Sequence, residues 1–94
     1  MVDVVSVRPL PNYRLHLVFD DGVEGEVDFR EVVPFVGVFA PMRDPKYFAQ
    51  VRVHPEFKVV FWPNDADIDS DVLHAKITGT YDELMSHRAE LAEA

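Results

Sequence analysis

An alternation of apolar and polar residues on both sides of an Asp-Gly pair constrains this chain more than any other feature. The apolar side chains of residues 13–19 fall on one face of an extended chain: Leu15, Leu17 and Phe19. Asp21-Gly22 follows, and such a pair between two alternating runs favours a type I′ turn, which needs positive φ at both central residues. With Val23–Phe29 as the return strand, the pattern predicts a β-hairpin.

Shorter elements are expected in the rest of the chain. They are a strand at 2–9 that Pro9 and Pro11 end, short helices at 29–33 and 45–50, a second hairpin with strands at 51–54 and 57–62, and a short helix near 71–75. Asp28 and Asp44 are suited to cap the first two helices, because a carboxylate at this position accepts a free backbone N–H. Pro45 supports the second helix, since proline fits the first helical position.

The C-terminal residues 80–94 predict one further helix of the same domain as residues 1–79. Thr80 and Glu83 match a capping box. The helix carries a narrow apolar stripe, made of Leu84, Met85, Leu91 and Ala92. Docking of this stripe on the chain's own sheet is the default, and a homodimer through this helix is the alternative.

Charge and composition exclude several classes of function. The formal net charge is −8, and the nine Lys and Arg residues are scattered singly along the sequence. DNA and RNA backbones are bound by clusters of such residues, so we predict no direct contact with nucleic acid. An acidic face suits a small, basic protein partner, although acids also keep a small domain soluble. No cysteine is present, which excludes disulfides and zinc sites with sulfur ligands.

The apolar segments are short. The longest, Val32–Ala40, is broken by Pro34 and Gly37, whereas a membrane span needs roughly 20 apolar residues. The first residues alternate like a strand and include an acid, unlike the basic and then apolar start of a signal peptide. We therefore predict a cytoplasmic protein that does not contact a membrane.

A motif after the second predicted hairpin carries a family resemblance. It reads Phe61-Trp62-Pro63-Asn64-Asp65-Ala66-Asp67-Ile68, followed by Asp71-Val72-Leu73. Three upstream motifs accompany it: Leu15-x-Leu17-x-Phe19-Asp20-Asp21-Gly22, Val27-Asp28 and Phe48-x-x-Val51. Together they resemble the small bacterial domain of unknown function numbered 2442 (DUF2442) over residues 3 to 75. Asp65 stands where this family usually has Gly, and His74 where it usually has Tyr.

The resemblance implies a small α+β domain with a curved antiparallel sheet of two or more hairpins and short helices. No enzymatic activity is established for the family, and we expect no cofactor. Members of the family resemble proteins encoded beside another short protein, in an arrangement like a toxin–antitoxin pair, and some are fused to a helix-turn-helix domain. The departure at Asp65 is tolerable, since Asp is among the few residues other than Gly that adopt positive φ.

Four alternating acids raise the question of a metal site: Asp65, Asp67, Asp69 and Asp71. In an extended segment they would point to one side and attract Ca²⁺ or Mg²⁺. The spacing does not match an EF-hand, because counting from Asp65 the sixth position is Ser70 and the twelfth Lys76, where Gly and Glu are needed. Turn formation and helix capping explain the same acids without a metal.

His74 follows Asp71 by three residues, so the two side chains could meet on one helical face. A His–Asp pair can begin general-base catalysis, but no nucleophile motif accompanies it. Trp62 beside Pro63 could be a binding platform, although a lone Trp in a small domain is more often part of the core. The residues of the signature, for fold or binding, are Trp62, Pro63, Asn64, Asp67, Asp71, Leu73 and His74.

The sequence therefore predicts a non-catalytic protein-interaction or regulatory module, which the family arrangement would make the antitoxin-like half of a two-protein pair. The alternative is a small metal-dependent hydrolase that uses the acidic loop, with Asp67 and Asp71, together with His74. A third possibility is a structural relic of a larger protein.

Overall fold

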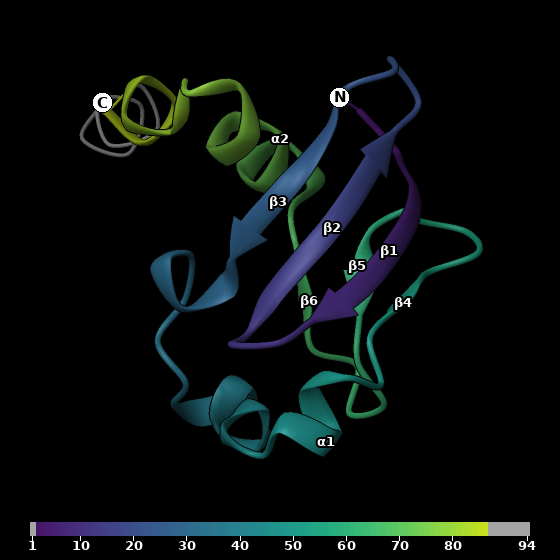
Figure 1. Ribbon diagram of the computed structural model, residues 1–94, viewed down its shortest axis with the longest axis vertical. Helices are drawn as coiled ribbons and strands as arrows, with labels where there is room; N and C mark the ends of the chain where they lie inside the picture. The colour runs from purple at the N-terminus through teal and green to yellow at the C-terminus, as the bar shows by residue number, and fades with distance from the viewer. Residues whose placement is uncertain (1, 87–94) are drawn as a thin grey trace.

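The computed structural model describes residues 2–86 and has two three-stranded antiparallel sheets, in the orders β1-β2-β3 and β4-β5-β6 (Figure 1). The strands are β1 (Val4–Leu10), β2 (Arg14–Phe19), β3 (Glu24–Asp28), β4 (Arg52–Val53), β5 (Val60–Phe61) and β6 (Asp67–Ile68). The helices are the 3₁₀ helices η1 (Phe29–Glu31) and η2 (Gly37–Arg43) and the α-helices α1 (Pro45–Phe48) and α2 (Ser70–Thr78). Residues 81–86 are also helical. The predicted α+β class is confirmed.

The first sheet follows the predicted alternation. Leu15, Leu17 and Phe19 of β2 are all buried, and their polar neighbours point outward. Pro9 does not end β1 as predicted but pairs with Leu15 inside it. A proline is tolerated there because β1 is an edge strand of its sheet.

The turn of the first hairpin differs from the predicted type I′. Gly22 has φ +87°, but Asp20 and Asp21 are not among the residues with positive φ. Gly22 N donates to Phe19 O at 3.0 Å, and Phe19 N donates to Val23 O at 2.9 Å. This is a three-residue hairpin loop in which glycine supplies the single left-handed position.

The second sheet is small and lies against the first. Strands β4 and β1 contact each other, and Val4 N donates to Lys58 O at 2.8 Å (Figure 1). The predicted second hairpin is present, but its strands have two residues each. Strand β6 was not predicted, because a two-residue strand between turn residues leaves no periodic signal.

The core fills the space between the sheets and the helices. Its largest fully buried side chains include Trp62, Phe19, Phe29, Leu15, Leu17, Met42 and Leu73. Helix α2 packs on β3 at Gly25, where a Cβ atom would lie 2.9 Å from Ile77 Cγ2. Gly25 therefore lets the helix come close to the strand.

Acidic side chains cap the short helices. Asp28 accepts from Arg30 N at the start of η1, and Asp44 accepts from Lys46 N at the start of α1, both as predicted. Helix α2 is longer than expected, begins after Asp69, and ends at Gly79 with φ +83°. Thr80 does not form the predicted capping box within residues 80–83, since its hydroxyl lies 3.0 Å from the Thr78 hydroxyl instead.

Part of the expected C-terminal helix lies outside the described residues. Leu84 and Met85 of the predicted stripe are half-buried, whereas Leu91 and Ala92 belong to residues 87–94. The homodimer alternative, which depends on the whole stripe, therefore stays a prediction. Within residues 2–86, no helix combines the length and apolar character needed to cross a membrane.

Candidate functional site

Trp62 belongs to the core and is not a binding platform. Its side chain is 1% exposed, and its ring lies 5.0 Å from that of Phe29 and 5.9 Å from that of Phe48. The indole Nε1 donates to Phe48 O at 2.9 Å, so the one polar group of this side chain is satisfied. Leu73 of α2 is likewise fully buried, while Pro63 is exposed.

Asn64 fixes the turn after Trp62. Its Nδ2 donates to Val38 O at 2.9 Å and its Oδ1 accepts from Ala66 N at 3.1 Å, while its backbone N donates to the Tyr47 hydroxyl at 3.0 Å. Asp65 then adopts φ +66°, which agrees with the expectation that it occupies a glycine position. The signature therefore joins this turn to η2 and α1.

The four alternating acids do not converge. Asp65 lies in the turn, Asp67 begins β6, Asp69 caps α2, and Asp71 lies in the first turn of α2. In the described part of the chain, no group of three or more His, Asp or Glu side chains is placed to hold a metal ion. Their structural tasks separate them, because a turn, a strand and a helix cap point successive residues in different directions.

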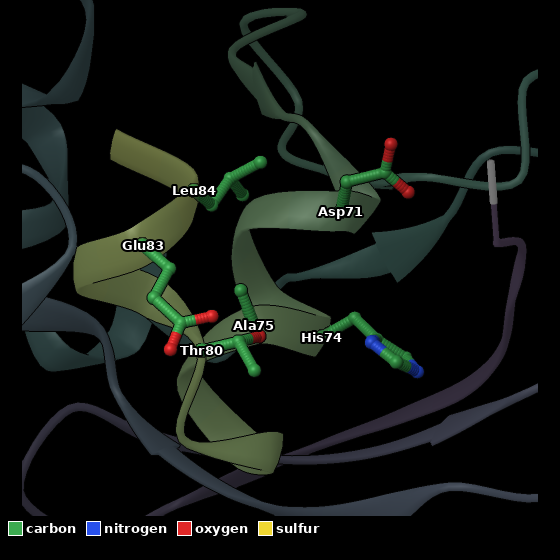
Figure 2. A pocket seen from close by; sticks show the side chains of 6 residues that line it. All are labelled: Asp71, His74, Ala75, Thr80, Glu83 and Leu84. Atoms are coloured by element: carbon green, nitrogen blue, oxygen red, sulfur yellow. The ribbon is translucent and has the colours of Figure 1, made fainter. Parts of the chain in front are cut away.

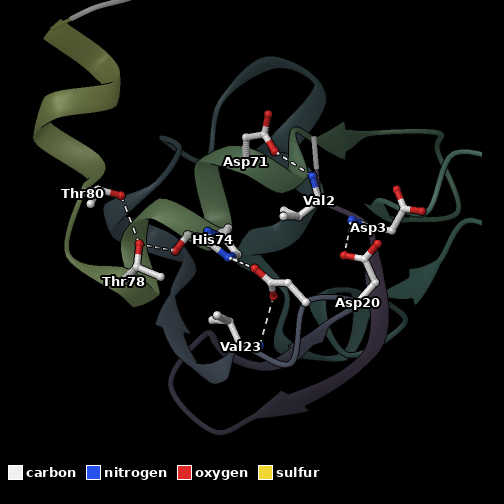
Figure 3. A network of polar contacts seen from close by, with 9 residues as sticks. Val2, Asp3, Asp20, Val23, Asp71, His74, Thr78 and Thr80 are labelled. Carbon is white, nitrogen blue, oxygen red and sulfur yellow. Dashed lines mark hydrogen bonds and ion pairs between the residues drawn. The ribbon is translucent and has the colours of Figure 1, made fainter.

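His74 pairs with Asp21 and not with Asp71 (Figure 3). Its Nε2 lies 2.8 Å from Asp21 Oδ2, and its ring meets that of Phe19 edge-on at 5.0 Å. Asp21 Oδ1 also accepts from Val23 N at 3.0 Å. His74 therefore does form a His–Asp pair, but its partner is Asp21 instead of the expected Asp71. The pair joins α2 to the turn between β2 and β3.

Asp71 and Asp20 hold the start of the chain in the same network (Figure 3). Asp71 Oδ1 accepts from Val2 N at 3.1 Å, and Asp20 Oδ1 accepts from Asp3 N at 3.2 Å. Asp71 thus contributes to the attachment of the N-terminal segment to α2. A catalytic pairing with His74 is not formed.

A shallow pocket of about 380 Å³ lies between α2 and the helical residues 81–86, and its lining includes Asp71, His74 and Glu83 (Figure 2). These three side chains point in different directions (Figure 2). General acid–base work needs titratable groups aimed at one reacting position. This pocket therefore gives the hydrolase hypothesis no geometric support.

The pKa of Asp21 is held below its ordinary value of 3.8 by the Val23 backbone N–H and by His74. A carboxyl group with a lowered folded-state pKa stabilises the fold above its unfolded value, and this contribution is lost as the pH falls through the folded value. Below pH 3.8, protonation of Asp21 should therefore weaken the link between α2 and the turn.

We expect Asp21→Asn to reduce the dependence of the free energy of unfolding on pH below 3.8. The amide of Asn is not protonated in this range, so its contacts do not change with pH. Urea unfolding followed by circular dichroism at several pH values between 7 and the acid limb measures this slope. Asp82→Asn, at an exposed acid outside the network, should leave the slope as in the wild type. An unchanged slope in Asp21→Asn would show that the pair adds no pH-dependent stability.

An aromatic group on the outer face of the second sheet was not predicted from the sequence. His54 stacks on Phe57 at 4.6 Å and meets Phe61 edge-on at 4.9 Å. Phe57, which was expected to begin a strand, lies in the turn between β4 and β5 and is 66% exposed. The sequence does hold one indication of this exposure, because Phe57 lies between the charged residues Glu56 and Lys58 and just after Pro55, a residue typical of turns.

Exposed bases gather on neighbouring elements although they are far apart in the sequence. Arg8 lies on β1, Arg52 on the adjacent β4, and Lys58 in the turn whose backbone binds Val4. Among residues 2–86, none of these three side chains forms an ion pair or a hydrogen bond. We call Arg8, Arg52 and Lys58 the basic edge. A search for runs of bases in the sequence misses it, because the fold assembles it.

Comparisons with known proteins agree with the resemblance. A family described as "Protein of unknown function (DUF2442)" matches residues 4–79. The fold is similar to that of a solved protein from Nitrosomonas europaea described as a putative DNA binding protein, with 26% identity and a TM-score of 0.70. The match covers 82% of this chain and 49% of that one, so the chain spans about half of that protein's length. No curated protein matches the chain.

The second comparison corrects one expectation. We predicted that nucleic acid is not a direct partner, because the bases are scattered in the sequence. A neighbour in both fold and sequence is described as a putative DNA binding protein, and this finding overturns that prediction. The prediction considered only the spacing of bases along the sequence. The fold places Arg8, Arg52 and Lys58 on adjacent elements without acidic partners in the described residues, whereas Arg14 and Arg30 form ion pairs with acids.

Proposed function

The chain belongs to the DUF2442 family of proteins of unknown function, and we propose that it is a non-catalytic module of a DNA-binding regulatory protein. The observation that carries the proposal is the basic edge, in which three exposed bases on adjacent elements lack acidic partners within residues 2–86. Unpaired bases of this kind are free to contact phosphates.

The distribution of acids supports one orientation toward DNA. At the far edge of the first sheet, β3 carries Glu24, Glu26 and Asp28. The fields of these acids would repel a phosphate backbone, whereas the β1 and β4 side would face it. Bases on the acidic side are neutralised locally, since Arg14 lies 3.2 Å from Glu26 and Arg30 lies 2.8 Å from Asp28.

Three phosphate contacts give only weak binding, which suits a module of a longer protein. The neighbour described as a putative DNA binding protein is about twice as long as the aligned part, and its other half could add contacts of its own. Linked modules bind far more tightly than either does alone, because the second contact is intramolecular.

The geometry of Asp67, Asp71 and His74 favours no catalytic role. The antitoxin-like pairing and the cytoplasmic location stay predictions.

The proposal is tested by fluorescence anisotropy of a labelled DNA duplex at a series of low salt concentrations. Three phosphate contacts predict a slope of about −2.7 for log K against log salt concentration. We expect the triple variant R8Q/R52Q/K58Q to lose most of this binding and its salt dependence. The control R14Q/R30Q, whose bases are ion-paired, should keep the slope.

Two results would contradict the proposal. One is an absence of binding by the wild type at low salt. The other is an equal loss of affinity in the triple variant and the control, which would mean that net charge and not the basic edge determines the interaction. Circular dichroism of each variant verifies that the fold is retained.

A further inference from the structure

A second surface site lies on the outer face of the second sheet and is separate from the pocket near His74. It is a small pocket of about 160 Å³, lined by His54, Phe57, Phe61, Asp65 and Asp67. Its walls combine three aromatic rings with two exposed carboxylates. Phe57 is the most exposed of the large apolar side chains in the described residues, at 66%. Contiguous exposed apolar surface marks interaction sites, whereas apolar residues exposed singly are normal.

The rings are held in place by the turn between β4 and β5. His54 Nδ1 accepts from Glu56 N and Phe57 N, each at 3.1 Å, and His54 N donates to Val59 O at 2.8 Å. Because Nδ1 accepts two N–H groups, the proton of the neutral ring lies on Nε2. The turn therefore holds the imidazole ring in place against Phe57, so binding of a ligand orders few additional groups.

The carboxylates are fixed by a different part of the chain. Asp67 is the direct cross-strand neighbour of Phe61, so their side chains lie on the same face of the sheet. Asp65 is held by a turn in which its N donates to Trp62 O at 2.9 Å. The side chain of Asn64 supports the same turn through Ala66. Two negative charges are thus placed beside the rings by a turn anchored to the core.

We propose that this pocket binds the arginine side chain of a basic protein partner. A guanidinium group is planar, stacks on aromatic rings and donates two parallel hydrogen bonds to a carboxylate, so both kinds of wall suit it. A nucleotide would also find rings to stack on, but its phosphate would be repelled by Asp65 and Asp67. Arg52 pairs with Phe61 and therefore shares the face of Asp67, but it does not line the pocket, whose two charged side chains are both acidic.

This inference does not depend on the proposed contact with DNA. The basic edge and the arginine pocket occupy different residues and bind ligands of opposite charge. Arg52 of the basic edge is the cross-strand neighbour of Phe61, so the two sites adjoin on this face of the second sheet. Failure of one test leaves the other unaffected.

The test is an NMR titration of the full chain with N-acetyl-arginine-methylamide, and with the citrulline analogue as the neutral ligand of the same shape. We expect arginine to shift the backbone amides of residues 54–57, 61 and 65–67. Phe57→Ala and Asp67→Asn should each weaken binding about threefold, the effect of one exposed cation–π contact or ion pair. Val36→Ala and Asp82→Asn, which change an exposed apolar residue and an exposed acid elsewhere, should leave the affinity unchanged.

Three outcomes would overturn the inference. Citrulline could shift the same amides with equal affinity, which would show that the charge is not recognised. Arginine could shift amides along β3 and α2 while those of the pocket stay in place, which would show general attraction to acids. Cytidine monophosphate could shift the pocket amides at lower concentration than arginine does, which would make the pocket a platform for bases. Amide spectra of the variants outside residues 54–67 show whether the fold is kept.

Discussion

Replacement of Trp62 by alanine should lower the free energy of unfolding by about 4 kcal/mol, the usual cost of removing a large buried aromatic side chain. The indole is 1% exposed, touches the rings of Phe29 and Phe48, and joins the second sheet to α1 through its hydrogen bond to Phe48 O. A domain of this length has a total stability of roughly 5–14 kcal/mol at the usual value per residue. The substitution would therefore remove a large part of it.

Trp62→Phe separates the packing of the ring from its hydrogen bond. The phenyl group keeps most of the contacts but leaves Phe48 O without its donor, so we expect a loss of about 2 kcal/mol. Urea unfolding followed by far-ultraviolet circular dichroism measures both variants without relying on tryptophan fluorescence. Val36→Ala, at a 55% exposed apolar residue, is the control and should change the stability little. Equal stability of Trp62→Ala and the wild type would mean that the indole is not part of the core.

The second large effect is expected at Gly25, where β3 and α2 come close. A Cβ atom there would lie 2.9 Å from Ile77 Cγ2, a distance that real contacts almost never show. Isoleucine is branched at Cβ, which restricts its χ1 rotamers, so the Cγ2 methyl cannot turn away easily. Gly25→Val should therefore cost about 2 kcal/mol by overpacking, although valine itself favours strands.

A double-mutant cycle identifies the cause. Ile77→Ala alone should destabilise the chain, because Ile77 packs partly buried against the core. In the Gly25→Val background the same change should restore stability, since it removes the atoms that clash. If the two costs instead add to within about 0.5 kcal/mol, the residues are not coupled and the close approach does not limit the strand. Urea unfolding of the four proteins provides the measurement.

Local rules in the sequence accounted for much of the fold. The alternation of Leu15, Leu17 and Phe19 fixes which face of β2 is buried, and the Asp-Gly pair fixes where the chain reverses. Asp28 and Asp44 cap helices that begin where capping chemistry places them. Each of these features is decided by residues within a few positions of one another, so the sequence displays them directly.

The parts that were missed depend on contacts between distant residues. Asp21 was assigned to a turn, and its pairing with His74 joins positions 53 residues apart. The basic edge combines positions 8, 52 and 58, whose elements meet only when β1 lies beside β4 and the turn that follows it. Phe57 was placed in a strand because its apolar character matched one, whereas the turn held by His54 exposes it. Spacing rules do not contain this information.

The contact between Val2 and Asp71 has a consequence for how the protein is made. These residues are 69 positions apart, and the apolar face of the first sheet is covered by Val60, Trp62 and Leu73. On a ribosome, β1, β2 and β3 emerge before β4, β5 and α2 and can pair locally, but the residues that cover their inner face are synthesised later. The nascent chain therefore keeps this face bare until nearly all of residues 2–79 have left the exit tunnel. During that interval it is a candidate for chaperone binding and for association with other nascent chains.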